Sequence, residues 1–145
     1  MKATISSLSI SALAAAIALS TPAGAQSEDQ SKVSLELNNL TSSEAGCLAT
    51  FMVKNGFDQP LEKVGYEIVL FDTEGLVERM MVLDFSPLST GKTRVRQFDL
   101  PGTTCEQIGR VLVNDAAFCE GGNLPAQACL ERLETSARPQ VEFGS

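Results

Sequence analysis

The stretch CLATFMVKNGFDQPLEKVGYEIVLFDTEG, residues 47–75, decides the fold. Apolar and polar residues alternate at both of its ends, which is the period-two pattern of half-buried β-strands. Asn55 and Gly56 interrupt the alternation because both tolerate left-handed backbone angles, and Pro60 cannot donate a hydrogen bond to a sheet. Residues 72–75, Asp-Thr-Glu-Gly, form a hairpin signal. The stretch therefore predicts two strands, a polar connection between them and a third strand that returns from the hairpin.

Similar alternation before and after this stretch brings the expected total to about six or seven short strands. Turn residues separate them and little helix is indicated, so the sequence predicts an all-β antiparallel sandwich, with a closed barrel as the alternative. Within residues 92–100 the alternation breaks, because Val95 is odd-numbered whereas Phe98 and Leu100 are even-numbered. We expect a β-bulge near Arg96 to bring all three apolar side chains to the core. The expected inward residues of the two central strands are Cys47, Ala49, Phe51, Val53, Val64, Tyr66, Ile68 and Leu70.

The C-terminal segment has a different composition. Pro125 precedes a run of helix-forming residues in which Cys129, Leu130 and Leu133 fall at helical spacing. The pattern predicts a short helix over residues 125–136, laid on the sheet. The last nine or so residues are expected to fray, because chain ends are poorly ordered unless they are tied down.

The N-terminus has the three-part layout of a secretory signal peptide. Lys2 supplies positive charge, an apolar run follows, and Ala23-Gly24-Ala25 is a small-residue cleavage site. The apolar run is short for a membrane span, which needs about 20 residues, so an uncleaved anchor is the less favoured alternative. We expect Sec-type export to the periplasm and no membrane span after cleavage. The predicted organisation is a signal peptide at 1–25, a flexible lead at 26–32, a β-sandwich domain at 33–119 and a disulfide-tethered helix and tail at 120–145.

Cleavage after residue 25 would remove Lys2 and change the formal net charge from −7 to −8. An acidic surface repels phosphate backbones, so we predict no nucleic-acid partner. The four cysteines all follow the cleavage site, and an even number in an exported chain predicts two disulfides with three possible pairings. If consecutive strands run antiparallel, Cys47 and Cys105 lie at one end of the sandwich and Cys119 at the other, ten residues before Cys129. We therefore predict the pairs Cys47–Cys105 and Cys119–Cys129.

Residues that could carry out chemistry are scarce. The chain has no His, which is the commonest general base near neutral pH, and no nucleophile elbow or phosphate-binding glycine loop. The cysteines lack the C-x-x-C spacing of common zinc sites, so a metal–thiolate site is the weaker alternative to disulfides. The sequence therefore predicts no enzyme, no catalytic residue, no metal and no cofactor.

A basic stripe is the one candidate binding feature. Lys92, Arg94 and Arg96 alternate along one expected strand, and Arg79 and Arg110 join them if the order of strands allows. Arg forks bind carboxylates bidentately, so the stripe predicts a docking patch for an acidic protein partner in the cell envelope. The alternative is ordinary ion pairing with carboxylates on neighbouring strands.

The central stretch also resembles a known family. The runs V-x-N at residues 53–55 and V-x-Y-x-I-x-L-F-D-x-x-G at residues 64–75, with Leu61 between them, are similar to FxLYD-type immunoglobulin-like domains of exported bacterial proteins. More closely, G-x-x-R-V-R-Q-F-D-L at residues 91–100 and R-V-L-V-N at residues 110–114 are similar to a group of short exported bacterial proteins. The resemblance implies an immunoglobulin-like sandwich and transfers no catalytic activity. The predicted function is therefore a periplasmic, non-enzymatic binding or interaction module. The alternative is a small ligand carrier or hydrolase with a pocket at one end of the sandwich.

Overall fold

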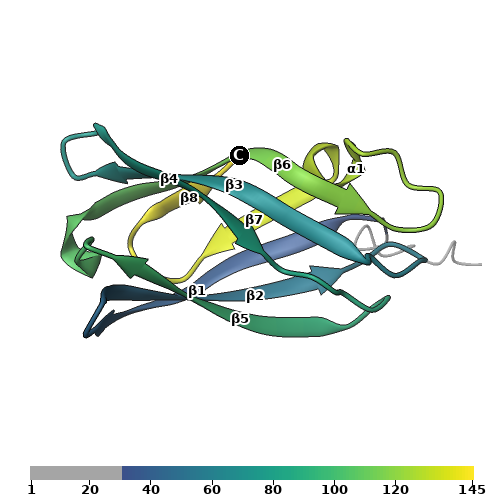
Figure 1. The fold of residues 1–145 in the computed structure, drawn as a ribbon, viewed down its shortest axis with the longest axis horizontal. Coiled ribbons are helices and arrows are strands. Elements are labelled where there is room, and N and C mark those ends of the chain that lie inside the picture. The colour runs from purple at the N-terminus through teal and green to yellow at the C-terminus, as the bar shows by residue number, and fades with distance from the viewer. Residues whose placement is uncertain (1–30) are drawn as a thin grey trace, which may run out of the picture.

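The computed structural model describes residues 31–145, so the predicted signal peptide and most of the predicted lead lie outside the described residues. Eight strands and two very short helices form the fold (Figure 1). They are β1 (Val33–Ser43), β2 (Gly46–Asn55), β3 (Lys63–Asp72), β4 (Val77–Asp84), β5 (Thr93–Pro101), the 3-10 helix η1 (Cys105–Gln107), β6 (Ile108–Glu120), α1 (Ala128–Glu131), β7 (Leu133–Ala137) and β8 (Glu142–Gly144).

The strands make two four-stranded sheets. One has the order β5-β2-β1-β7 and is called the β2 sheet below; the other has the order β4-β3-β6-β8 and is called the β3 sheet. Their facing sides share one hydrophobic core, and all eight side chains expected to point inward from β2 and β3 are buried. The predicted all-β sandwich is therefore confirmed.

Aromatic side chains occupy the centre of this core. The ring of Phe85 contacts the rings of Phe51, Tyr66 and Phe98 edge-on, with centroids 5.2–6.0 Å apart. The Tyr66 hydroxyl donates a 2.8 Å hydrogen bond to the carbonyl of Cys129, which satisfies the polar tip of a fully buried side chain. Burial raises the pKa of the Tyr66 phenol well above its ordinary value, so this hydroxyl keeps its proton.

Both predicted disulfides are present. Cys47 at the start of β2 is bonded to Cys105 in η1, with Cα atoms 4.9 Å apart, and Cys119 in β6 is bonded to Cys129 in α1, with Cα atoms 5.8 Å apart. Two disulfides indicate an oxidising, extracellular-type compartment. Among residues 31–145, no helix has the length and apolar character needed to cross a membrane.

The C-terminal segment differs from its prediction. The helix expected over residues 125–136 is reduced to α1, because residues 133–137 instead form β7. This strand pairs in parallel with β1, at the edge of β1 that does not pair with β2. The tail expected to fray contains β8, which pairs in parallel with β6 and packs Phe143 on Phe51, with ring centroids 5.8 Å apart. A helix of 12 residues is marginal by itself, whereas each strand gains hydrogen bonds from a sheet edge that is already formed. Both sheets are therefore mixed rather than purely antiparallel.

The β-bulge expected near Arg96 is also absent. The pairing of β2 with β5 runs without a shift from Gly46 opposite Pro101 to Lys54 opposite Thr93. The unbroken register leaves Val95 on the outer side, where its side chain is 56% exposed. It also places Arg94 and Arg96 on the same side as Phe98, toward the gap between the sheets.

The two long sides of the sandwich differ. On one side β7 and β8 approach each other, whereas on the other side the edge strands are β4 and β5, joined by the connection 85–92 (Figure 1). Met81 of β4 and Phe98 of β5 pack against the core along this second side. It is therefore bordered by two edge strands whose outer backbone groups meet no neighbouring strand in the part of the chain that the structure describes.

Candidate functional site

The outer face of the β3 sheet exposes large apolar side chains. Within residues 31–145, five large hydrophobic residues are more than half exposed, and four of them lie on β4 or in the hairpin that precedes it. The four are Leu76, Val77, Met80 and Val82, with 62%, 58%, 56% and 52% of their surface exposed. Single exposed apolar residues are ordinary, but this clustering on one strand is not.

These side chains are continuous with further apolar residues on β3 and β6. Val69 lies opposite Met80 on one side and opposite Leu112 on the other, and Phe71 lies opposite Val77. Residues directly opposite each other in antiparallel strands share a face of the sheet, so the set lies on one face, in which Val69 itself is only 4% exposed. We call it the apolar face, and it consists of Val69, Phe71, Val77, Met80, Val82 and Leu112.

Carboxylates border the apolar face where β4 ends. Glu67 lies opposite both Val82 and Asp115, and Asp84 is the last residue of β4. Glu67 accepts a 2.6 Å hydrogen bond from the Asn114 amide, which is neutral and leaves the negative charge in place. This end of the apolar face is therefore acidic.

Carboxylates border the hairpin end as well. A hollow of about 520 Å³ lies there, lined by Asp72, Thr73, Glu74, Leu76, Val77, Glu78 and Gln107. The Asp72 carboxylate accepts hydrogen bonds from the backbone N–H groups of Glu74 and Leu76, both 2.9 Å, and so holds the turn. Glu78 accepts a 3.2 Å bond from the hydroxyl of Thr103. No group of three His, Cys, Asp or Glu side chains in the described part of the chain could hold a metal ion.

Arg110 is the predicted patch residue that reaches the apolar face. Its guanidinium lies over the ring of Phe71, 5.6 Å from the centroid, and its Nε lies 3.3 Å from a carboxylate oxygen of Glu142. The Nε makes no aligned hydrogen bond despite this distance, so the contact with Glu142 is a simple ion pair. Arg110 belongs to the β3 sheet, so the structure separates it from the other predicted patch residues on β5.

The remaining basic residues line what we call the open side of the sandwich, the long side bordered by the edge strands β4 and β5. Lys92 precedes β5, Arg94 is exposed, and Arg96 is half-buried with its guanidinium donating to the carbonyls of Val95 and Ser86. Arg79 lies on the inward row of β4, with a guanidinium nitrogen beside Gly102. The stem of Arg96 therefore covers apolar surface, and the row Lys92–Arg94–Arg96 places positive charge along an edge strand, where charge opposes pairing with another chain. The acidic partner inferred from this row stays a prediction.

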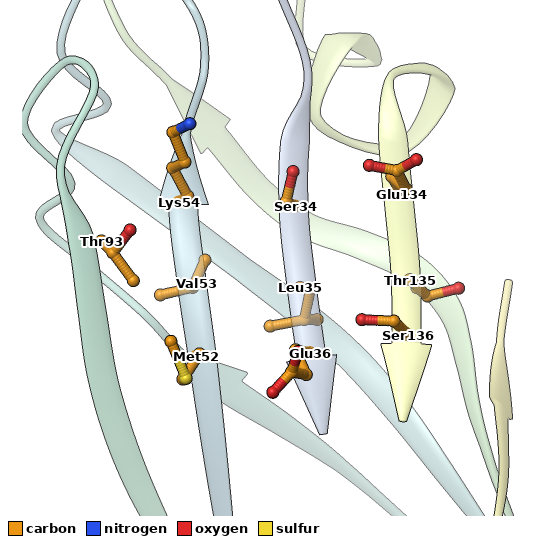
Figure 2. A pocket seen from close by; sticks show the side chains of 10 residues that line it. All are labelled: Ser34, Leu35, Glu36, Met52, Val53, Lys54, Thr93, Glu134, Thr135 and Ser136. Atoms are coloured by element: carbon orange, nitrogen blue, oxygen red, sulfur yellow. The ribbon is translucent and has the colours of Figure 1, made fainter. Parts of the chain in front are cut away.

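A second hollow lies on the outer face of the β2 sheet. It has a volume of about 330 Å³, and Figure 2 shows its lining side chains on β5, β2, β1 and β7 side by side. Its carboxylates are already engaged, because Glu36 accepts from Asn38 and Arg138, and Glu134 lies 2.7 Å from the Lys32 ammonium. Ion pairing accounts for these charges, and the hollow is open rather than enclosed.

Two carboxylates give the fold a predictable response to acid. Hydrogen bonds from Asn38 and Arg138 hold the pKa of Glu36 below its ordinary value, and hydrogen bonds from Ser86, together with the charge of Arg96, lower the pKa of Asp84. Each carboxylate therefore stabilises the fold fully above the ordinary carboxyl pKa of about 4 and loses this contribution as the pH falls through the lower folded value.

We expect the free energy of unfolding to change little from about pH 8 to pH 6, since the chain has no His, and to fall below about pH 5. The double variant Glu36→Gln/Asp84→Asn should show a shallower fall, measured by urea denaturation at each pH. An unchanged slope in this variant would contradict the assignment of the acid response to these two groups.

Comparisons with known proteins leave the site to be interpreted from its geometry. No protein-family model, no curated protein and no solved structure matches the chain.

Proposed function

We propose that the chain is an exported, periplasmic, non-enzymatic interaction module that binds a protein partner through the apolar face. The observation that carries the proposal is the exposure of Val77, Met80 and Val82 on one strand, continuous with Val69, Phe71 and Leu112 on the neighbouring strands. Contiguous exposed apolar surface is costly in water and marks contact surfaces in soluble proteins.

Three further features support the proposal. The disulfides suit an exported protein, and the two hollows described above lie on the outside of the sheets. The resemblance to FxLYD-type domains implies the same class of role. The acidic hollow at the hairpin end supports the alternative, a small ligand carrier or hydrolase, but its Asp72 carboxylate is occupied by the turn.

A matched pair of substitutions tests the proposal. Val82 and Val95 are the same residue type, are 52% and 56% exposed, and lie on the two edge strands of the open side. A photo-crosslinking residue at position 80 is expected to give a discrete adduct in the native cell envelope, and Val82→Lys should reduce its yield at least tenfold. Val95→Lys should leave the yield unchanged, because it lies on the other sheet.

Two results would contradict the proposal. One is the absence of any discrete adduct at position 80 when the tagged protein is exported and folded. The other is an equal loss with Val82→Lys and Val95→Lys, which would show that the adduct does not depend on the apolar face. Unchanged urea denaturation midpoints for both variants control for stability.

A further inference from the structure

Within residues 31–145, no strand pairs with the outer edge of β4, so its backbone directs hydrogen-bonding groups outward. The N–H of Phe85 bonds to the carbonyl of Val64 at 2.9 Å, which sets the phase of the ladder between β3 and β4. In antiparallel pairs, successive residues turn their N–H and C=O groups alternately toward and away from the partner. The odd-numbered residues of β4 therefore bond to β3, and the even-numbered residues face the free edge. The register shift between β3 and β4 leaves Glu78 without an opposite residue, so those that follow the shift are Met80, Val82 and Asp84.

The same three residues carry their side chains on the outer face of the sheet. Met80 lies opposite Val69 and Val82 opposite Glu67, both on the outer row of β3, and Asp84 lies opposite Gly65. A strand added at this edge would bond to the backbone of these residues and place its own alternate side chains beside theirs. The apolar face and the free edge are thus two aspects of one binding surface.

The charges around this surface select the chemistry of an added strand. Cross-strand neighbours of opposite charge stabilise a pair, and like charges directly opposite destabilise it. Side chains opposite Met80 and Val82 should be apolar. A side chain opposite Asp84 should be basic, and so should one that reaches Glu74 and Glu78 beside the hairpin hollow.

The other edge strand of the open side has the opposite character. The β5 edge carries Lys92, Arg94 and Arg96, so a strand with basic flanks is repelled there and attracted to β4. Pairing of β4 with β4 of a second copy is disfavoured, because it brings together the acidic ends of two like surfaces on chains of the same negative net charge.

We propose that β4 accepts an extended segment of a protein partner by β-strand addition, and that this segment has the pattern basic–x–apolar–x–apolar–x–basic. The inference rests on the proposed function and specifies the mode of binding and the partner's chemistry. The pattern reads the same in both directions, so it fits an antiparallel or a parallel added strand.

The experiment uses the disulfide-bonded protein, residues 26–145, labelled with ¹⁵N, and the peptide Lys-Thr-Val-Thr-Val-Thr-Lys. We expect saturable shifts of the amide signals of Met80, Val82 and Asp84, together with slower hydrogen exchange of these amides. Val82→Lys should weaken binding at least tenfold and Val95→Lys should not. Replacing both Lys of the peptide with Glu, or raising NaCl to about 0.5 M, should also weaken binding.

Two N-methylated peptides separate strand addition from simple apolar docking. In an antiparallel complex in register, the Val residues of the peptide direct their N–H groups at β4, whereas the central Thr directs its N–H away. N-methylation of both Val residues should reduce affinity at least tenfold. N-methylation of the central Thr should leave affinity within about threefold, since that group bonds to nothing in the complex.

Three other outcomes of the peptide experiment would each contradict a different part of the proposal. If the peptide binds at the apolar face without slowing amide exchange on β4, strand addition is wrong and the proposed function stands. If the labelled protein forms a concentration-dependent dimer through β4, the occupant is a second copy and the basic-flanked partner is wrong. If no peptide shifts the β4 signals while position 80 still crosslinks in the envelope, only the inferred partner chemistry fails.

Discussion

Replacing Cys47 and Cys105 together with Ala is expected to lower the free energy of unfolding by about 4 kcal/mol. The bridge closes a loop with a sequence separation of 58, and cross-linking a loop of this length removes chain entropy from the unfolded state by about that amount. It also joins the start of β2, where Cys47 is fully buried, to η1. Equilibrium urea denaturation, with the midpoint and slope fitted together, measures the loss.

The second disulfide supplies the matched comparison. Cys119 and Cys129 are only 10 residues apart in sequence, so Cys119→Ala/Cys129→Ala is expected to lose about 3 kcal/mol, less than the first pair. A larger loss from the shorter loop would contradict the loop-entropy account. It would point instead to the packing of α1 against β6 and to the bond from the Tyr66 hydroxyl to the Cys129 carbonyl.

Asn55→Ala is expected to cost about 3 kcal/mol, the largest effect on stability predicted here for a single substitution. The side chain is fully buried, and its amide donates to the carbonyls of Gln59 and Leu88, at 2.9 and 3.1 Å. Its carbonyl oxygen accepts from the N–H of Phe57 at 2.9 Å. Truncation therefore leaves the Gln59 carbonyl and the Phe57 N–H without this partner, and each buried unsatisfied group costs about 1–3 kcal/mol. The Leu88 carbonyl keeps its 2.9 Å bond from the N–H of Leu61.

Asn39→Ala is the control for this substitution. Asn39 is an exposed residue of β1 whose amide bonds to the Thr41 hydroxyl, so its loss should change the free energy of unfolding by less than about 0.5 kcal/mol. If Asn55→Ala were as mild, water would be replacing the lost partners. The site would then be less enclosed than its zero exposure implies.

The end of β2 at Asn55 is predicted correctly, but its physical cause differs from the predicted one. The sequence predicts that Asn55 and Gly56 end the strand through left-handed backbone angles, and β2 does end at Asn55. Neither residue has a positive φ; the chain turns because the Asn55 side chain ties the connections 56–62 and 85–92 together. By contrast, Gly75 has a φ of +84°, as the hairpin prediction requires.

The central strands and disulfides could be predicted because their signals are local. Period-two alternation assigns a side chain to the core from its neighbours in sequence alone. The disulfide pairing is predicted from the end of the sandwich at which each Cys lies, which follows from the alternating direction of consecutive strands. The strands β7 and β8 have no such signal, since residues 133–137 and 142–144 become strands only when β1 and β6 offer an edge. Gly65 is similar, because its lack of a side chain is explained only by the Phe118 ring that lies over it.

The candidate site was partly visible in the sequence. Residues 77–83 carry apolar side chains on both faces of a strand, a pattern typical of strands covered on both sides. Among residues 31–145, only the inner side of β4 is covered, which is why Met80 and Val82 are exposed. That β4 is an edge strand follows from the strand order, which depends on contacts between distant segments. The sequence therefore predicts a candidate patch on β5 and does not single out the apolar face proposed above.

The most direct test of strand addition at β4 is a nuclear Overhauser measurement on the complex with the Lys-Thr-Val-Thr-Val-Thr-Lys peptide. With Met80 and Val82 hydrogen-bonded to an antiparallel peptide, Met81 lies in a non-hydrogen-bonded pair, where opposing Cα atoms are only about 4.5 Å apart. A strong signal between the Hα of Met81 and the Hα of the central peptide Thr is predicted. Signals confined to the side-chain methyl groups of Met80 and Val82, with none to the Hα of Met81, would contradict strand addition.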